Sequence, residues 1–230
     1  MFTLFFANSA LAQGAGSWNI LNVKYNINDN WSVFTEGQLR SLKFYNHFHY
    51  YEYKAGFNYK LYNNVKLGLG AGNYSTYKEG GNFVLPKNNE EFRIWAEVAL
   101  TENLRKLKID HRYRAEFRFT SNGFRNRFRY RIGAWYPFGK QIKGFSHYLI
   151  SISNEIFFTN KEPYFERNRL LLSLQYKFSK ALALQIGFLN QFDYKINDET
   201  GRDFLQVGLF YEIFQKKSSG GAKNIKIDND

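Results

Sequence analysis

The sequence predicts an all-β protein, an antiparallel up-and-down transmembrane β-barrel of about 10–12 strands. Three observations predict this fold. Apolar and polar residues alternate along most of the chain, aromatic residues make up 20% of it, and the mean hydropathy is nevertheless −0.50. Because successive side chains of a strand point to opposite faces, such alternation gives each strand one apolar and one polar wall. A membrane barrel needs that combination, since its outer wall faces lipid and its interior is polar.

The clearest alternation runs from Lys106 to Tyr136. Apolar residues fill one register and charged residues the other, and the pattern resumes after the turn TSNGF. Each arm is long enough to cross a bilayer as a tilted strand of about 9–11 residues. The segment is therefore predicted to be a β-hairpin whose charged wall faces the lumen. That wall carries seven arginines: Arg112, Arg114, Arg118, Arg125, Arg127, Arg129 and Arg131.

Composition excludes several classes of protein. No run of about 18 apolar residues follows the first dozen residues, whereas each span of a helical membrane protein needs roughly 20. The chain has no Cys, so disulfides and thiolate metal sites are excluded. Most of the net charge of +12 arises between Arg105 and Arg131. Because those basic residues alternate with apolar ones, no nucleic-acid-binding surface is expected.

The first residues resemble the end of a secretory signal peptide. A short apolar stretch precedes Ala10-Leu11-Ala12, an A-x-A-like cleavage site before Gln13. Residues 1–12 are therefore expected to be a signal-peptide remnant, with an ordinary buried segment as the alternative. No repeat or linker divides the remainder, so residues 13–214 are predicted to form one barrel and residues 215–230 a flexible periplasmic tail.

Eleven alternating segments are predicted to be strands, because clusters of Asn, Gly, Asp, Ser or Pro separate them. In order, they are residues 18–27, 31–42, 48–61, 65–76, 91–100, 107–119, 125–136, 147–157, 168–178, 182–193 and 203–214. Short turns are expected at 28–30, 62–64, 101–103 and 179–181, with a longer one at 137–145. The opposite connections are longer, at 78–89, 159–166 and 195–202. Short turns at one end and long loops at the other are typical of outer-membrane barrels.

Pro86, Pro137 and Pro163 are all predicted to lie in loops or turns, because proline cannot donate to a sheet ladder. On one strand, Gly68, Gly70 and Gly72 share a face and are predicted to leave space for large lumen side chains such as arginine.

The strand number stays open at this point. Single-chain bacterial barrels normally have an even number of strands with both ends in the periplasm. If 203–214 descends to the periplasm, 31–42 is the first ascending strand of ten, and 18–27 is an additional strand or a pairing segment. A short strand at 224–228 gives twelve. The soluble alternative is a lipocalin-like barrel or a β-sandwich, but most segments here exceed the usual 5–6 residues of a soluble strand.

The last predicted strand carries a second signal. Its sequence QVGLFYEIF has the spacing polar-x-Gly-x-x-aromatic-x-hydrophobic, formed by Gln206, Gly208, Tyr211 and Ile213. This spacing resembles the C-terminal β-signal through which the barrel-assembly machinery recognises its clients. The expected partners are that machinery during biogenesis and outer-membrane lipid. No nucleic acid and no specific protein partner are inferred, and the expected location is the bacterial outer membrane.

The lumen arginines are the strongest functional candidates. Lone buried charges are very costly, so these guanidinium groups need partners. One interpretation is a closed, structural barrel filled by an Arg–Glu network. Another is an anion- or solute-selecting pore, or a site that binds a phosphate or carboxylate through the arginine fork. The expected acidic partners are Glu36, Glu52, Glu91, Glu97, Asp110, Glu116 and Glu155.

Histidines offer two further candidates. His47 and His49, near Glu52, have a spacing that can bind a metal, but a pair of interfacial aromatics is the preferred interpretation. His111 falls in the apolar register, which would suit a lipid-modifying enzyme acting at the outer wall. No His-x-Ser, phosphate loop, zinc-protease or Gly-x-Ser-x-Gly motif is present. We therefore predict no enzyme activity, no cofactor and no metal site.

Residues 16–40 and the arginine hairpin resemble the domain-of-unknown-function 2490 family across about residues 14–214. The likeness implies an outer-membrane β-barrel of a kind common in the Gram-negative Bacteroidota. It implies no activity and no catalytic residues. Besides the core "RYRAEFRF…RFRYRIG", it rests on the opening Trp18, the step from Tyr25 to Trp31, and the ending Glu36, Gln38 and Arg40.

Overall fold

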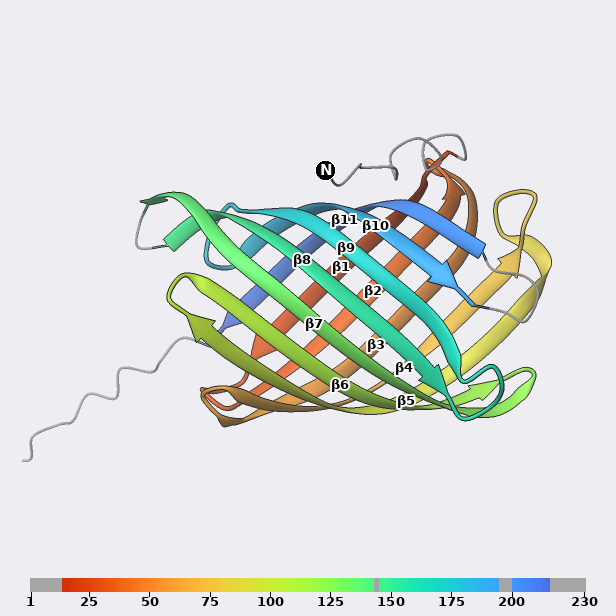
Figure 1. The fold of residues 1–230 in the computed structure, drawn as a ribbon, viewed down its shortest axis with the longest axis horizontal. Helices are drawn as coiled ribbons and strands as arrows, with labels where there is room; N and C mark the ends of the chain where they lie inside the picture. Colours follow the sequence, from red (N-terminus) through yellow and green to blue (C-terminus); the bar gives the residue numbers. More distant parts are fainter. Residues whose placement is uncertain (1–13, 143–144, 195–199, 216–230) are drawn as a thin grey trace, which may run out of the picture.

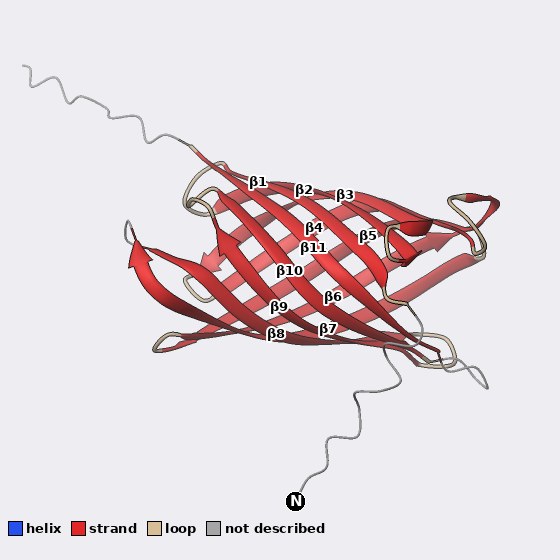
Figure 2. Ribbon diagram, turned by 90° about the horizontal axis from the view of Figure 1, so that it is seen from above, coloured by secondary structure: helices blue, strands red, loops and turns tan. Residues whose placement is uncertain are grey.

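The computed structural model describes residues 14–142, 145–194 and 200–215, which form a closed barrel of eleven strands (Figure 1). Strands that follow one another in the chain pair antiparallel and run obliquely around the cylinder (Figure 2). The predicted all-β barrel and all eleven predicted strand positions are confirmed. The strands are β1 (Gly16–Asn26), β2 (Trp31–Lys43), β3 (Asn46–Tyr62), β4 (Val65–Lys78), β5 (Val84–Leu104), β6 (Leu107–Thr120), β7 (Gly123–Ile142), β8 (Phe145–Thr159), β9 (Phe165–Lys177), β10 (Leu182–Asp193) and β11 (Thr200–Phe214).

A parallel pair, β1 with β11, closes the barrel. Gly16 lies beside Phe204 and Asn26 beside Phe214, while β1 pairs antiparallel with β2 on its other side. An odd number of up-and-down strands requires this seam, because the first and last strands then run in the same direction. The segment predicted at 18–27 is therefore a full member of the wall. The predicted signal peptide, the tail beyond Gln215 and the strand considered at 224–228 lie outside the described residues.

The two mouths of the barrel are built from different connections. We call one the loop end; it contains the connections at 44–45, 79–83, 121–122 and 160–164. The other, the turn end, contains those at 27–30, 63–64, 105–106 and 178–181. The chain enters β1 at the loop end and leaves β11 at the turn end (Figure 1).

Several segments predicted to be loops are strand instead. β5 begins at Val84 and runs to Leu104, so it includes much of the predicted loop 78–89 and the predicted turn 101–103. Likewise, β7 extends to Ile142 through most of the predicted turn 137–145. The longer connection predicted at 159–166 is reduced to 160–164, and β11 begins within the predicted loop 195–202.

The prediction that all three prolines lie in loops or turns is therefore wrong for two of them. Pro86 lies in β5 and Pro137 in β7, whereas Pro163 lies in a connection as predicted. The physical reason is that both strand prolines occupy extensions paired on one side only. β5 pairs with β6 only from Glu91 onward, and β7 pairs with β6 only as far as Trp135. A proline there costs no ladder bond on its unpaired side.

Alternation gives the barrel two chemically different walls. Outward positions on every strand carry exposed large apolar side chains, such as Leu21, Phe128 and Leu172. Inward positions carry mostly charged and polar side chains, many of them buried. The interior is thus held together mainly by polar contacts. The buried apolar cluster within it is small and consists of Trp18, Leu189 and Phe204. Across the described residues, no helix is long and apolar enough to span a membrane.

The inward glycines of β4 make room for large neighbours, as predicted, but those neighbours are not arginines. A Cβ added at Gly70 would overlap the indole of Trp95, and one added at Gly68 would lie 2.8 Å from Glu97. At Gly72 the obstructing side chain is Lys54. Since Trp95 is 1% exposed, it has no free space into which to move.

Replacing Gly70 with valine is therefore expected to lower the free energy of unfolding by about 1–3 kcal/mol, because it overpacks the wall against Trp95. The measurement is urea unfolding of the full chain in detergent micelles, followed by tryptophan fluorescence. Gly37→Val is the matched control, because a Cβ at Gly37 meets nothing within 4 Å. Equal stability of the two variants would contradict this account of the packing.

Candidate functional site

A network of ion pairs lies inside the barrel on β6, β7 and β8. Glu116 of β6 accepts bonds from Arg127 Nη2 at 2.6 Å and from Arg129 Nη1 at 2.7 Å. Arg129 also reaches Glu155 of β8 at 2.8 Å, and Arg112 reaches the same carboxylate at 2.6 Å. Glu116 and Arg127 are register partners on adjacent strands, so the pairing follows directly from the alternation. Glu155 therefore binds two guanidinium groups, and Glu116 binds two and also lies 3.6 Å from Arg114 Nη1.

The same arrangement continues along β5 and β6. Glu97 and Arg114 are also register partners, with Nη2 of the arginine 2.6 Å from Oε2 of the glutamate. Glu91 accepts bonds from Arg118, at 2.5 Å, and from Arg93. These contacts cross neighbouring strands or join alternate positions of one strand.

Towards the turn end, Asp110 pairs with Arg131 at 2.9 Å and accepts a bond from the Trp135 indole. The structure therefore brings six of the seven predicted lumen arginines against predicted acidic partners. The exception is Arg125, which is exposed at the loop end and has no ion pair among the described residues.

Two predicted acidic partners bind cations that the hairpin did not suggest. Glu36 is held by Lys54 at 2.6 Å, and Glu52 is held by Lys54 at 2.7 Å and by Arg40 at 3.1 Å. Glu166 lies in a segment that the sequence predicts to be a loop, so it is not among the predicted acidic partners. Its carboxylate nevertheless reaches Arg118 and Arg127, each at 3.1 Å. A register shift at Phe157/Phe158 accompanies its approach to the lumen.

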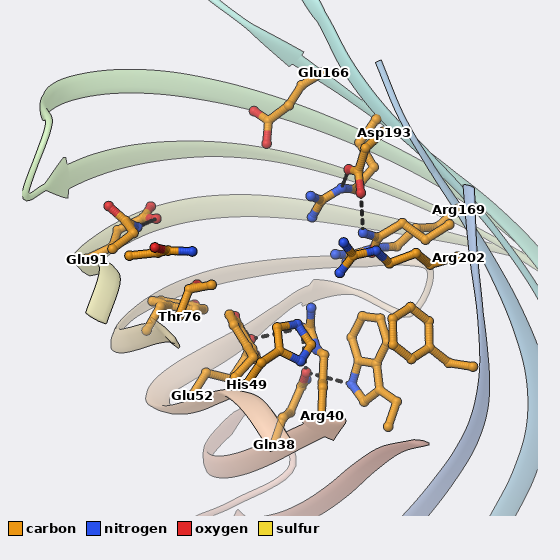
Figure 3. A pocket seen from close by; sticks show the side chains of 18 of the residues that line it. Gln38, Arg40, His49, Glu52, Thr76, Glu91, Glu166, Arg169, Asp193 and Arg202 are labelled. Carbon is orange, nitrogen blue, oxygen red and sulfur yellow. Dashed lines mark hydrogen bonds and ion pairs between the residues drawn. The ribbon is translucent and has the colours of Figure 1, made fainter. Parts of the chain in front are cut away.

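A cavity of about 370 Å³ lies in the interior at the loop end (Figure 3). Ten strands, β1–β7 and β9–β11, contribute side chains to it, together with residues of the adjoining connections. Its lining includes nine basic side chains, Arg40, Lys54, Arg93, Arg118, Arg127, Arg129, Arg167, Arg169 and Arg202. The five acidic ones are Glu52, Glu79, Glu91, Glu166 and Asp193.

One corner of the cavity is formed by β1 and β2. The Arg40 guanidinium lies 3.4 Å from the centre of the Trp18 ring and 4.0 Å from that of Tyr50. The indole of Trp18 donates to Oε1 of Gln38 at 2.8 Å, and Arg40 donates to the same oxygen at 3.0 Å. Stacking and a shared acceptor fix the guanidinium in one orientation. Trp18, Gln38 and Arg40 are three of the residues on which the family resemblance rests.

The histidine candidates do not lie together. His49 lines the cavity, whereas His47 has a φ of 57° and so breaks the regular alternation between them. Within the described ranges, no group of three or more His, Cys, Asp or Glu side chains is placed to hold a metal ion. His111 lies on the outer wall, and its Nδ1 is 2.9 Å from the hydroxyl of Tyr130.

Fold and interior together define a closed β-barrel with buried Arg–Glu ion pairs in its lumen. A family model described as "Protein of unknown function (DUF2490)" matches residues 15–202. This match covers most of the chain, so the protein belongs to that family. No curated protein matches the sequence.

Removing a shared carboxylate should destabilise the barrel strongly. Glu116→Gln is expected to lower the free energy of unfolding by about 3–5 kcal/mol, because Arg127 and Arg129 each lose a buried partner. Urea unfolding in micelles measures the effect. Glu102→Gln, an exposed change on β5, is expected to stay within about 0.5 kcal/mol of the parent. A Glu116→Gln protein as stable as that control would show that the network contributes nothing to stability.

Proposed function

We propose that the protein is an outer-membrane β-barrel without enzyme activity, closed to the passage of solutes by its ion-paired interior. The observation that carries the closure is the burial of large inward side chains on three nearby strands, β5, β6 and β8. Trp95 on β5 and Glu116 on β6 are each 1% exposed, and Phe157 on β8 is 0% exposed. A water-filled channel passing beside these side chains would leave them exposed to solvent.

Membrane placement is supported by the outer wall. Exposed apolar side chains encircle the barrel on all eleven strands, whereas soluble monomers rarely expose an apolar patch larger than a few hundred Å². Exposed aromatic residues mark both ends of this surface. Trp31 and Tyr62 lie at the turn end, and Tyr45 and Tyr164 lie at the loop end. Aromatic girdles of this kind occur at the two interfaces of outer-membrane barrels.

We also propose that the protein is exported and assembled in the outer membrane of a Gram-negative bacterium, such as a member of the Bacteroidota. Residues 1–12 would be the signal-peptide remnant, and the tail after β11 would be periplasmic. Gln206 and Gly208 face inward on β11, whereas Tyr211 and Ile213 face outward. Through this alternation, β11 presents one polar face and one apolar face to the barrel-assembly machinery. Lipid is the partner of the outer wall.

The orientation can be tested with single cysteines, because the chain has none of its own. Lys161→Cys at the loop end is expected to react with a membrane-impermeant maleimide in intact Gram-negative cells. Lys180→Cys at the turn end is the matched variant and is expected to react only after the outer membrane is permeabilised. Both lysines are exposed in the structure. Gly14→Cys should behave like Lys161→Cys, because β1 begins at the loop end.

Equal labelling of the two lysine positions in intact cells would contradict the proposed orientation. Recovery of the protein from the periplasm without detergent would contradict membrane placement altogether.

Closure is tested by electrical recording. The purified protein, shown to be folded by heat-modifiable gel mobility, is expected to give no steady single-channel conductance in planar lipid bilayers. A steady conductance would overturn the proposal. If its ion preference also reversed in the Arg127→Glu/Arg129→Glu variant, the lumen would be an anion-selecting pore instead.

A further inference from the structure

Nine basic side chains line the cavity at the loop end, and eight of them pair with carboxylates, three of which (Glu36, Glu116 and Glu155) lie outside the lining. Five acidic side chains belong to the lining itself. Each of these carboxylates already has a basic partner from the same lining. Glu52 binds Arg40 and Lys54, and Asp193 binds Arg167. The remaining three are bound likewise: Glu91 by Arg93 and Arg118, Glu166 by Arg118 and Arg127, and Glu79 by Arg202.

Arg169 is left without a carboxylate at ion-pair distance in the part of the chain that the structure describes. Its register neighbour Glu155 is bound by Arg112 and Arg129. The Nε of Arg169 donates to Oε1 of Gln191 at 2.9 Å. Its two terminal nitrogens have no hydrogen-bond partner among the described residues, and the side chain extends into the cavity (Figure 3).

The guanidinium of Arg169 is also held in place. It lies 4.8 Å from the centre of the Trp18 ring and 4.8 Å from that of Phe157, two buried aromatic side chains. Gln191, which holds its Nε, is itself fixed by a bond from its Nε2 to Asp193 at 2.6 Å. A guanidinium anchored at Nε and packed against two rings loses little freedom when a ligand binds its free edge.

We propose that this cavity binds the phosphate group of a phosphorylated sugar, with Arg169 as the anion-binding residue. The free edge of a guanidinium presents two parallel N–H groups that match two phosphate oxygens. A phosphate carries about 1.5 to 2 negative charges, and this charge would face the unpaired guanidinium of Arg169.

The size and remaining chemistry of the cavity favour a sugar phosphate over bare phosphate. About 370 Å³ falls within the roughly 300–1,000 Å³ typical of small-molecule sites. Thr76 and Asn88 supply a hydroxyl and an amide group in the lining for sugar hydroxyls. The inference rests on the closed interior proposed above, because a closed layer makes the loop-end cavity a dead end that retains a ligand.

Binding is tested by isothermal titration calorimetry on the full chain in detergent, which does not depend on membrane placement or conductance. Glucose 6-phosphate is expected to bind, inorganic phosphate to bind more weakly, and glucose to give no heat of binding. Arg169→Gln is expected to weaken binding of glucose 6-phosphate about tenfold or more, because the paired charge-assisted bonds are lost. Arg169→Lys keeps the charge without the guanidinium fork, so its affinity for glucose 6-phosphate should fall between those of the parent and Arg169→Gln.

Arg105→Gln is the control, since this exposed arginine lies between β5 and β6 at the opposite mouth. It is expected to bind like the parent. The site would be overturned if folded protein bound no glucose 6-phosphate, or if Arg169→Gln and Arg105→Gln bound it equally. Inorganic phosphate binding as tightly as glucose 6-phosphate would overturn the sugar assignment. No binding by a protein that is also silent in bilayers would refute the site and leave the closed barrel standing.

A further titration identifies the source of the sugar phosphate. Lipid A, a phosphorylated glycolipid, is added in the same detergent and tested for displacement of glucose 6-phosphate. Displacement supports the site with a lipid headgroup as ligand. Binding of glucose 6-phosphate without displacement by lipid A supports the same site with a soluble ligand.

Discussion

Pairing of opposite charges across adjacent strands is the constraint on which this barrel depends. Its interior is polar, and a buried guanidinium without a partner would cost more than the fold can offset. Glu97 faces Arg114 and Glu116 faces Arg127 as register partners. A shift of one residue would turn these arginines to the outer wall and separate them from their carboxylates. The alternation of apolar and charged residues along each strand therefore determines the register, the apolar outer surface and the ion-paired interior together.

Much of the fold follows from the alternation, but its irregular parts do not. Period-two patterning locates all eleven strands, since each strand has one apolar and one polar face. It cannot show where pairing becomes one-sided, so the extensions that carry Pro86 and Pro137 resemble turns in the sequence. The seam is also absent from the local pattern. The β1–β11 pair joins residues nearly two hundred positions apart, and only closure of the barrel shows that the first strand completes the wall.

In the interior too, contacts within one hairpin can be predicted from the sequence, whereas contacts between distant strands cannot. The arginines of β6 and β7 and many of their partners are predictable, because parity within one hairpin places them together. The surroundings of Arg169 are not predictable in this way. Trp18, Phe157 and Gln191 reach it from β1, β8 and β10, and their proximity depends on the curvature of the closed sheet. Glu166 is hidden for a different reason, since the adjoining strand has a register irregularity that no alternation predicts.

The parallel seam also determines how the barrel responds to force. Gly16 begins β1 at one mouth, and Phe214 ends β11 at the other. Tension applied through the two ends of the barrel therefore pulls these neighbouring strands past each other along their length. The backbone hydrogen bonds between β1 and β11 then share the load. In a barrel with both ends at one mouth, the hydrogen bonds between the first and last strands would break one after another. The odd strand number thus makes the closure that joins the most distant parts of the chain a shear joint.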